Sequence, residues 1–357
     1  MNWLYYLGLI IAGIIGAACL YLLIVAMVPG FSVPAQPLEK PKQAGRAVDA
    51  PRFGPIKEVG FEVKGTPVSA RLYLPENLSA PAPGIIMGHG AGGTMDLGLE
   101  AYALRFQQAG FAVLMFDYRH FGTSGGQPRQ LLWIPHQLED WAAAIEYVRR
   151  LQEIDPAGIA LWGTSLSGGH VIALAAKDHG IACVSAQCPG LDGRAAGEEF
   201  MKREGLKYAL RLVMHGQRDL VRSWLGLSPH KIPLVGRPGT VAMMPAPDAW
   251  AAFGRLAPEG FVNEVCARII IRGDKYRPVK QAHKVRCPVL LQICDQDHLT
   301  PVSAAEETAQ RLGDLATVIH YPIGHFDIYL EDNFEKSVAD QLAFFKKHLM
   351  KNKAFSD

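Results

Sequence analysis

Charge is missing from the start of this 357-residue chain, whose first charged side chain is Glu39. The segment from Trp3 to Val28 is almost continuously apolar. A helix of that length, rising about 1.5 Å per residue, exceeds the roughly 30 Å hydrocarbon core of a bilayer. A secretory signal would need a basic start and a shorter apolar core, and neither is present. The sequence therefore predicts a retained single-pass membrane anchor over residues 1–29.

Several function classes lack their usual sequence signals. The net charge is only +2 and no block of lysine and arginine occurs, so we expect no nucleic-acid partner. The sequence has no Walker-type Gly-x-x-x-x-Gly-Lys, so a nucleotide-binding loop of that type is not indicated. It also has no Cys-x-x-Cys spacing, so neither a metal site nor a redox dithiol is indicated. We expect no cofactor and no disulfide. The six cysteines are Cys19, Cys183, Cys188, Cys266, Cys287 and Cys294.

The flanks of the apolar segment predict its orientation. No lysine or arginine precedes it, and four follow it, which by the positive-inside rule places the rest of the chain in the cytoplasm, at the plasma or inner membrane. The four are Lys40, Lys42, Arg46 and Arg52. Small residues four apart, Ala12 with Gly16 and Gly13 with Ala17, are compatible with a homodimer through the anchor helix.

The chain beyond the anchor divides by its patterns. Residues 30–55 are rich in proline and predict a stiff linker. A hairpin is expected over 56–74, turning near Gly65, and then short apolar strands alternate with helices. We expect strands at 84–88, 112–116, 158–162, 181–186, 288–294 and 316–321, and helices at 98–109, 137–152, 166–177, 302–312 and 333–349. Such alternation predicts an α/β fold whose parallel sheet is covered on both faces. The alternation stops over 189–282, which predicts a helical cap inserted between core segments 56–188 and 283–357.

One short stretch carries the strongest chemical signal. Residues 161–169 read Leu-Trp-Gly-Thr-Ser-Leu-Ser-Gly-Gly and join a predicted buried strand to a predicted helix. Ser165 stands at the apex of this turn, in the pattern Gly-x-Ser-x-Gly of a nucleophile elbow. The last position is occupied by Ser167, which is still small. A serine at such a turn would project its hydroxyl from the edge of the sheet.

Partners for this serine follow in the order that serine catalysis on an α/β sheet requires. A serine needs a base, and the base needs an orienting acid. The strand at 288–294 ends in a loop with Asp295 and Asp297, and the strand at 316–321 is followed by His325. Either aspartate could serve as the acid on residue type alone.

With these motifs the chain resembles the alpha/beta-hydrolase superfamily, from about Glu58 to Leu349. The resemblance implies a mostly parallel, eight-stranded sheet with Ser165 as the nucleophile and His325 as the base. It also favours Asp297 over Asp295 as the acid, since the family pattern places the acid four residues before a proline, here Pro301.

The resemblance extends to the loop after the strand at 84–88, which reads Gly88-His89-Gly90-Ala91-Gly92-Gly93. It implies an oxyanion hole formed by the backbone N–H groups of Ala91 and Leu166. His89 is expected to form structural hydrogen bonds beside the pocket. Asp117 and Arg119, in the loop after the strand at 112–116, are expected to be structural, and Asp327 to be a helix cap or a loop charge.

The same glycine loop supports an alternative. Gly88-x-Gly90-x-x-Gly93 matches the dinucleotide fingerprint, and Asp117 ends the next strand, as in NAD-dependent oxidoreductases. That reading leaves the serine turn and the ordered aspartate and histidine loops unexplained, so the hydrolase interpretation is preferred.

The apolar side chains of the predicted cap would either line an acyl pocket or form the core of the cap itself. These are Trp224, Met243, Met244, Trp250 and Phe253. We take Met243 and Trp250, together with His89, as the pocket candidates. The prediction is a membrane-anchored serine hydrolase that cleaves amphiphilic or lipid-like carboxylic esters. A peptidase, a thioesterase or an acyltransferase would use the same triad, and a catalytically silent membrane scaffold is the third class.

Overall fold

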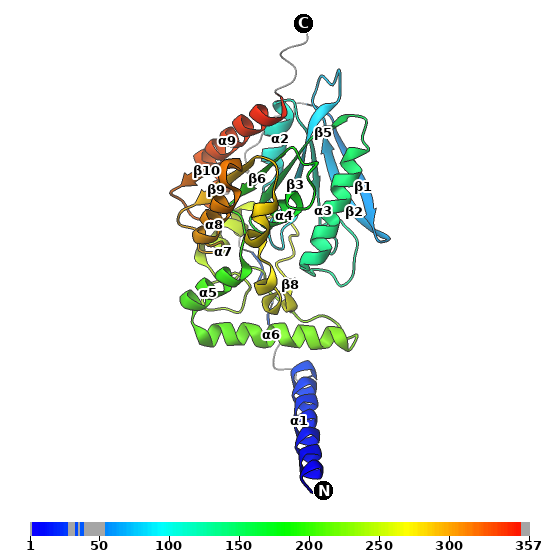
Figure 1. Ribbon diagram of the computed structural model, residues 1–357, viewed down its shortest axis with the longest axis vertical. Coiled ribbons are helices and arrows are strands. Elements are labelled where there is room, and N and C mark those ends of the chain that lie inside the picture. Colours follow the sequence, from blue (N-terminus) through cyan, green and yellow to red (C-terminus); the bar gives the residue numbers. More distant parts are fainter. Residues whose placement is uncertain (1, 28–32, 35, 39–53, 351–357) are drawn as a thin grey trace.

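The structure is a computed structural model that describes residues 2–27, 33–34, 36–38 and 54–350. Helix α1 (Asn2–Met27) projects from a body that contains all the other elements (Figure 1). By length and composition, α1 could cross a membrane. Most of the predicted linker lies outside the described residues. So do the four basic residues that predict the orientation, Lys40, Lys42, Arg46 and Arg52.

The body is built on an eight-stranded sheet in the order β1-β2-β4-β3-β5-β6-β9-β10. Its strands are β1 (Ile56–Val63), β2 (Thr66–Tyr73), β3 (Ala82–Gly88), β4 (Ala112–Phe116), β5 (Ile154–Thr164), β6 (Cys183–Gln187), β9 (Val289–Cys294) and β10 (Ala316–Tyr321). The pairs β1–β2 and β2–β4 are antiparallel and all other neighbours are parallel. The mostly parallel, eight-stranded α/β sheet predicted from the sequence is confirmed.

Both faces of the sheet are covered because successive side chains of a buried strand point to opposite sides. In β4, Val113 and Met115 join the core under α2 (Glu100–Gln108) and α9 (Glu331–Leu349). Leu114 and its neighbours Ala112 and Phe116 face the larger core on the other side. That side carries α3 (Ile134–Arg149), α4 (Leu166–Ala175) and α8 (Val302–Leu312) (Figure 1).

Among the element boundaries that differ from the prediction, two differ for identifiable reasons. Helix α3 begins at Ile134 rather than at 137, with a proline in its first turn. Proline is tolerated there because the first N–H groups of a helix have no acceptor inside the helix. Strand β5 begins at Ile154, since Ala82 and Pro83 of β3 pair with it before the register shifts at Gly84.

The insertion between β6 and β9 contains helices, as expected, together with a short strand pair and irregular segments. It contains α5 (Gly193–Glu204), α6 (Leu206–Trp224), α7 (Pro247–Leu256), the short antiparallel pair β7 (Lys231–Ile232) and β8 (Val265–Cys266), and 3-10 turns. A buried carboxylate organises the irregular part. Asp219 accepts hydrogen bonds from the backbone of His230 and from the backbone and guanidinium of Arg268.

The described residues of the predicted linker contact this insertion. The carbonyl of Gln36 accepts a hydrogen bond from the Asn263 amide at 2.9 Å, and Val33 and Leu38 pack against the larger core. Around Gln36, the chain between α1 and β1 is therefore attached to the insertion rather than held away from it.

Candidate active site

The sharp turn predicted at Ser165 joins β5 to α4. Ser165 has φ 55° and ψ −122°, a strained conformation for a residue with a side chain. The turn is tight enough that a Cβ atom on Gly163 would lie 2.2 Å from the carbonyl oxygen of Ser167. Only glycine therefore fits at the first position of the Gly-x-Ser-x-Gly pattern.

Ser167 does more at the last position of this pattern than remain small. Its hydroxyl donates to the carbonyl oxygen of His89 at 2.6 Å and also contacts the hydroxyl of Tyr118. Because the Ser167 proton is already used, Tyr118 donates to Ser167 and in turn accepts from the indole N–H of Trp141 at 2.7 Å. This buried chain of hydrogen bonds fixes the serine turn against the glycine loop.

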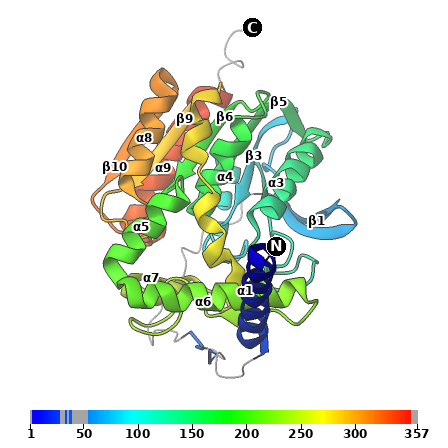
Figure 2. The ribbon, with the colours of Figure 1, turned by 60° about the horizontal axis from the view of Figure 1, so that its bottom comes forward.

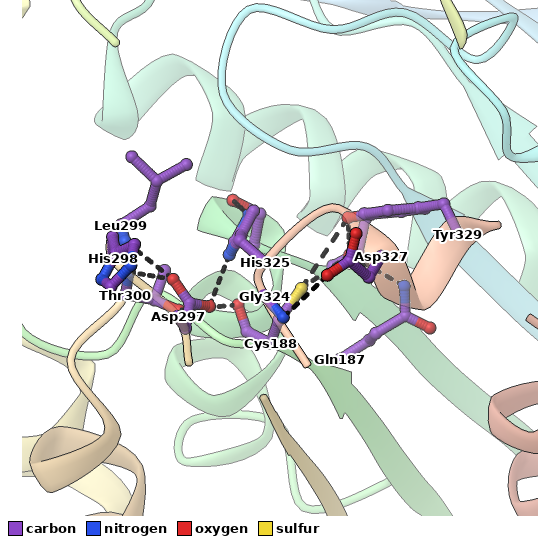
Figure 3. A network of polar contacts seen from close by, with 12 residues as sticks. Gln187, Cys188, Asp297, His298, Leu299, Thr300, Gly324, His325, Asp327 and Tyr329 are labelled. Carbon is purple, nitrogen blue, oxygen red and sulfur yellow. Dashed lines mark hydrogen bonds and ion pairs between the residues drawn. The ribbon is translucent and has the colours of Figure 1, made fainter. Parts of the chain in front are cut away.

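The structure brings the predicted Ser165, His325 and Asp297 together. The Nε2 atom of His325 lies 3.1 Å from Ser165 Oγ, and its Nδ1 atom lies 2.5 Å from Asp297 Oδ2. Figure 3 shows the Asp297 carboxylate between the His325 ring and Thr300. The three side chains come from loops at the carboxyl ends of β5, β9 and β10.

Asp297 is held in one orientation by four donors. Its Oδ1 accepts the N–H groups of Leu299 and Thr300 at 2.7 and 2.8 Å, and its Oδ2 accepts the Thr300 hydroxyl at 2.6 Å as well as the imidazole. Burial would raise the pKa of this carboxyl, but His325 and the Thr300 donors hold it below its ordinary value. Asp295, the other candidate acid, pairs instead with His320 at 2.7 Å near the surface.

The loop that carries His325 is fixed from both sides. Asp327, which begins a 3-10 turn, accepts the N–H of Gly324 at 2.9 Å, and the Tyr329 hydroxyl contacts that of Thr164 at the end of β5. Burial alone would lower the pKa of His325, but the Asp297 carboxylate raises it well above its ordinary value. Asp327 thus acts as a loop charge, one of the two predicted alternatives.

The two residues predicted to form the oxyanion hole line the same cavity as Ser165. Leu166 is the first residue of α4, so its N–H has no acceptor inside the helix. Ala91 and Leu166 both line the cavity around Ser165. A Cβ atom on Gly90 would lie 2.9 Å from Ser165 Cβ, which explains why the glycine loop can approach the serine so closely.

His89 is buried beneath this loop. Its Nδ1 atom lies 3.0 Å from the Gly90 carbonyl oxygen, and the ring packs edge-on against Tyr118. Burial lowers its pKa, so the ring is neutral and donates its Nδ1 proton to that carbonyl. It also borders a small cavity of about 40 Å³ beside Ser165 and His325.

Asp117 and Arg119 are occupied within the structure. The Asp117 carboxylate accepts the N–H groups of Met95 and Thr123 at 2.8 and 3.0 Å. Arg119 is buried against Asp140, whose pKa burial raises to about 6 in spite of the guanidinium. The Asp117 carboxylate, which would have to bind the ribose of a dinucleotide, therefore holds two loops together instead. This contradicts the oxidoreductase alternative.

An apolar pocket of about 290 Å³ opens beside Ser165. Met243 lines it, as predicted, and so does Met244. Trp250 does not line it but lies under the Arg237 guanidinium, and Trp224 is 64% exposed and belongs neither to this pocket nor to the core. The sequence did not identify the other lining side chains, because they converge from separate segments. They include Phe200, Arg203, Leu212, Ile269, Ile270 and Tyr276.

The sequence is similar to one protein-family profile and to several named proteins. The profile of the X-Pro dipeptidyl-peptidase (S15) family matches residues 64–210. The quorum-quenching protein AidA of Acinetobacter baumannii is 41% identical over 292 residues, which cover 81% of this chain and 94% of that protein. The thiohydrolase aneE of Aspergillus aculeatus is 38% identical over 133 residues, covering 37% of this chain and 41% of the relative.

Among solved structures, the alpha/beta hydrolase GrgF from a Penicillium species superimposes with a TM-score of 0.70 at 23% identity. The match covers 83% of this chain and 99% of GrgF. At this level of identity the likeness concerns the fold.

Proposed function

The chain belongs to the alpha/beta-hydrolase superfamily, and from that premise we propose that it is a membrane-anchored serine hydrolase that cleaves carboxylic esters. One observation carries the proposal. A continuous line of hydrogen bonds runs from Asp297 through His325 to Ser165, at the wall of an apolar pocket. This is the arrangement that turns a serine hydroxyl into a nucleophile.

The proposed reaction follows from the geometry. His325 Nε2 accepts the Ser165 proton as Oγ attacks the ester carbonyl, and Asp297 stabilises the imidazolium that forms. The N–H groups of Leu166 and Ala91 stabilise the negative oxygen of the tetrahedral intermediate. His325 then protonates the leaving alkoxide, and it activates the water that hydrolyses the acyl-enzyme.

The pocket indicates the acyl group. Its lining is mainly aliphatic and aromatic, and about 290 Å³ is at the small end of the range for ligand sites. We infer an ester with a single apolar chain rather than a bulky one. Matches to a thiohydrolase and to the S15 peptidase profile make a thioester the second candidate and a peptide bond the third.

We further propose that α1 is a retained anchor. The most apolar 18-residue window of its span from Trp3 to Met27 has a mean hydropathy of 2.8, and only 11% of that window is buried, so the span is covered by little else in the structure. The basic residues after it favour a cytoplasmic body, and its small residues favour pairing of two copies. Reporter fusions at the carboxyl end, active on only one side of the membrane, test the orientation.

A fluorophosphonate probe tests the reaction class. We expect it to label the full-length protein and to fail on Ser165→Ala, whose ester hydrolysis should fall by a factor of about 10⁴ or more. Ser303→Ala, at an exposed serine of α8, is the matched control and should keep both. Labelling that persists in Ser165→Ala would contradict the proposal. Hydrolysis of p-nitrophenyl esters of increasing chain length, beside a thioester and an anilide of the preferred acid, then identifies the bond.

A further inference from the structure

Helix α6 carries an exposed apolar stripe that packing in the body does not explain. Leu206, Leu210 and Met214 are 62%, 54% and 42% exposed. They lie at intervals of four residues, so they share one side of the helix. The opposite side of α6 is the buried one, where Leu212, His215 and Asp219 face the insertion.

The same stripe continues to the contact with α1. Gln217, three residues after Met214, accepts a hydrogen bond from the Tyr21 hydroxyl of α1 at 2.7 Å. Arg218 and Arg222 donate to the carbonyl oxygens of Val25 and Ala26 at 2.7 and 2.8 Å. These carbonyls belong to the last turn of α1, where a helix leaves its carbonyls without internal partners. Guanidinium groups of α6 thus hold the end of α1 against the helix.

The two helices are oriented as a span and a surface helix would be. Figures 1 and 2 show α6 running across the end of α1 rather than along it, between α1 and the rest of the body. Since α1 leaves α6 from the side that carries Gln217, the stripe of Leu206, Leu210 and Met214 faces the direction in which α1 extends.

Basic side chains border the stripe. Next to the stripe on the surface of α6 lies a second row of side chains, which are spaced four or seven residues apart, or about one or two helical turns. It consists of Lys207 and Arg211, which are exposed, and of Arg218 and Arg222, which are already bonded to the end of α1. An apolar stripe bordered by lysine and arginine is the composition of helices that lie in the headgroup region of a bilayer, where cations attract anionic lipids and apolar side chains reach the acyl boundary.

We propose that α6 lies on the membrane that α1 crosses, with Leu206, Leu210 and Met214 buried at its headgroup–acyl boundary. This inference rests on α1 being the anchor proposed above. It also explains where the pocket lies. Leu212 of α6 and Phe200 and Arg203 of α5 line the pocket, so it lies about one helix diameter, roughly 10 Å, from the lipid surface. An ester dissolved in the bilayer would need to travel little further to reach Ser165.

Spin labels in the full-length protein test the depth of α6. The protein is reconstituted in vesicles of phosphatidylcholine mixed with phosphatidylglycerol. In a Cys19→Ser background the five remaining cysteines are buried, so Leu206→Cys, Leu210→Cys and Met214→Cys can each be labelled alone. Val318→Cys, at an exposed apolar side chain of the edge strand β10, is the matched control.

We expect the three α6 labels to collide several-fold more with oxygen, relative to a water-soluble nickel chelate, than the label at 318. Equal ratios at the four positions would overturn the proposal. Spin–spin broadening at 210 that disappears on dilution with unlabelled protein would also overturn it, because a second copy would then cover the stripe. A label on the native Cys19 reports on α1 separately. If it lies in the bilayer while the α6 labels lie in water, the anchor stands and only the α6 proposal fails.

Discussion

The two regions on either side of the pocket, the sheet and helix α6, are built on opposite principles. On the sheet side, the buried polar side chains around the serine are held by hydrogen bonds: Asp297 has four donors, and Ser167 lies within a chain of hydrogen bonds. On the far side of α6, apolar side chains such as Leu210 are exposed and nothing in the described part of the chain covers them. The sheet side can position atoms for a reaction. The exposed side of α6 can only adapt to whatever medium surrounds it.

This difference separates the two tasks proposed for the molecule, catalysis and location at a membrane. Chemistry needs fixed geometry, because a misplaced base loses most of its catalytic effect. Location needs only apolar area and charge in the right place, which tolerates loose packing. Changes on the sheet side should therefore affect all substrates alike, whereas changes toward α6 should affect them according to their size or solubility.

The largest effect is expected at the acid of the triad. Asp297→Asn should lower kcat by a factor of about 10⁴, because the imidazole loses the partner that fixes its tautomer. The matched variant Asp295→Asn, which loses only a surface contact with His320, should change kcat less than about twofold. Steady-state hydrolysis of one p-nitrophenyl ester by both variants measures this. Comparable losses in the two would mean that the acid is wrongly assigned.

Filling the pocket should discriminate between substrates. Met243→Trp adds volume to the lining, so kcat/KM for a long-chain ester should fall by about 10- to 100-fold while that of an acetate ester changes little. Trp224→Ala, at an exposed side chain outside the pocket, should leave the chain-length profile in detergent solution unchanged. A uniform loss across chain lengths for Met243→Trp would place the acyl chain elsewhere.

The serine turn should lose stability when its hydrogen-bond chain is cut. Ser167→Ala leaves the Tyr118 hydroxyl and the His89 carbonyl without their buried partner, which should lower the free energy of unfolding by about 1–3 kcal/mol. Ser185→Ala offers a control, since that buried hydroxyl has no partner among the described residues. Urea unfolding of both variants in detergent compares them, and equal stability would remove the role given to Ser167.

The smallest effect is a shift in pH dependence. Only neutral His325 can accept the Ser165 proton. The value of kcat/KM should therefore be full above the pKa of His325 in the folded protein and should fall below it. Because Asp297 raises this pKa above 6.5, the acid limb should lie above that pH. In the residual activity of Asp297→Asn, the acid limb should move toward lower pH, because the carboxylate that raises the pKa of His325 is gone. An unmoved limb would assign it to another group.

Sequence patterns determined the catalytic part to a large extent. The α/β alternation, the elbow at Ser165 and the histidine after the last strand are local signals, because strand ends and tight turns impose residue types at fixed positions. Asp297 and Asp295, two residues apart, were distinguished only by a family pattern. The structure supplies the physical difference, since only Asp297 reaches the imidazole.

The apolar span of α1 was also determined by composition alone. About 26 uncharged residues in a row are long enough to cross the hydrocarbon core of a bilayer, whatever sequence follows them. Tertiary structure decided the rest. The pocket draws Phe200, Leu212 and Met243 from separate segments, and no periodicity within one segment records such a meeting. Likewise, a stripe such as that of Leu206 and Leu210 reads in sequence as one more core-facing side of a helix. Which side of a helix is buried depends on what packs against it, and that is fixed only when the whole chain has folded.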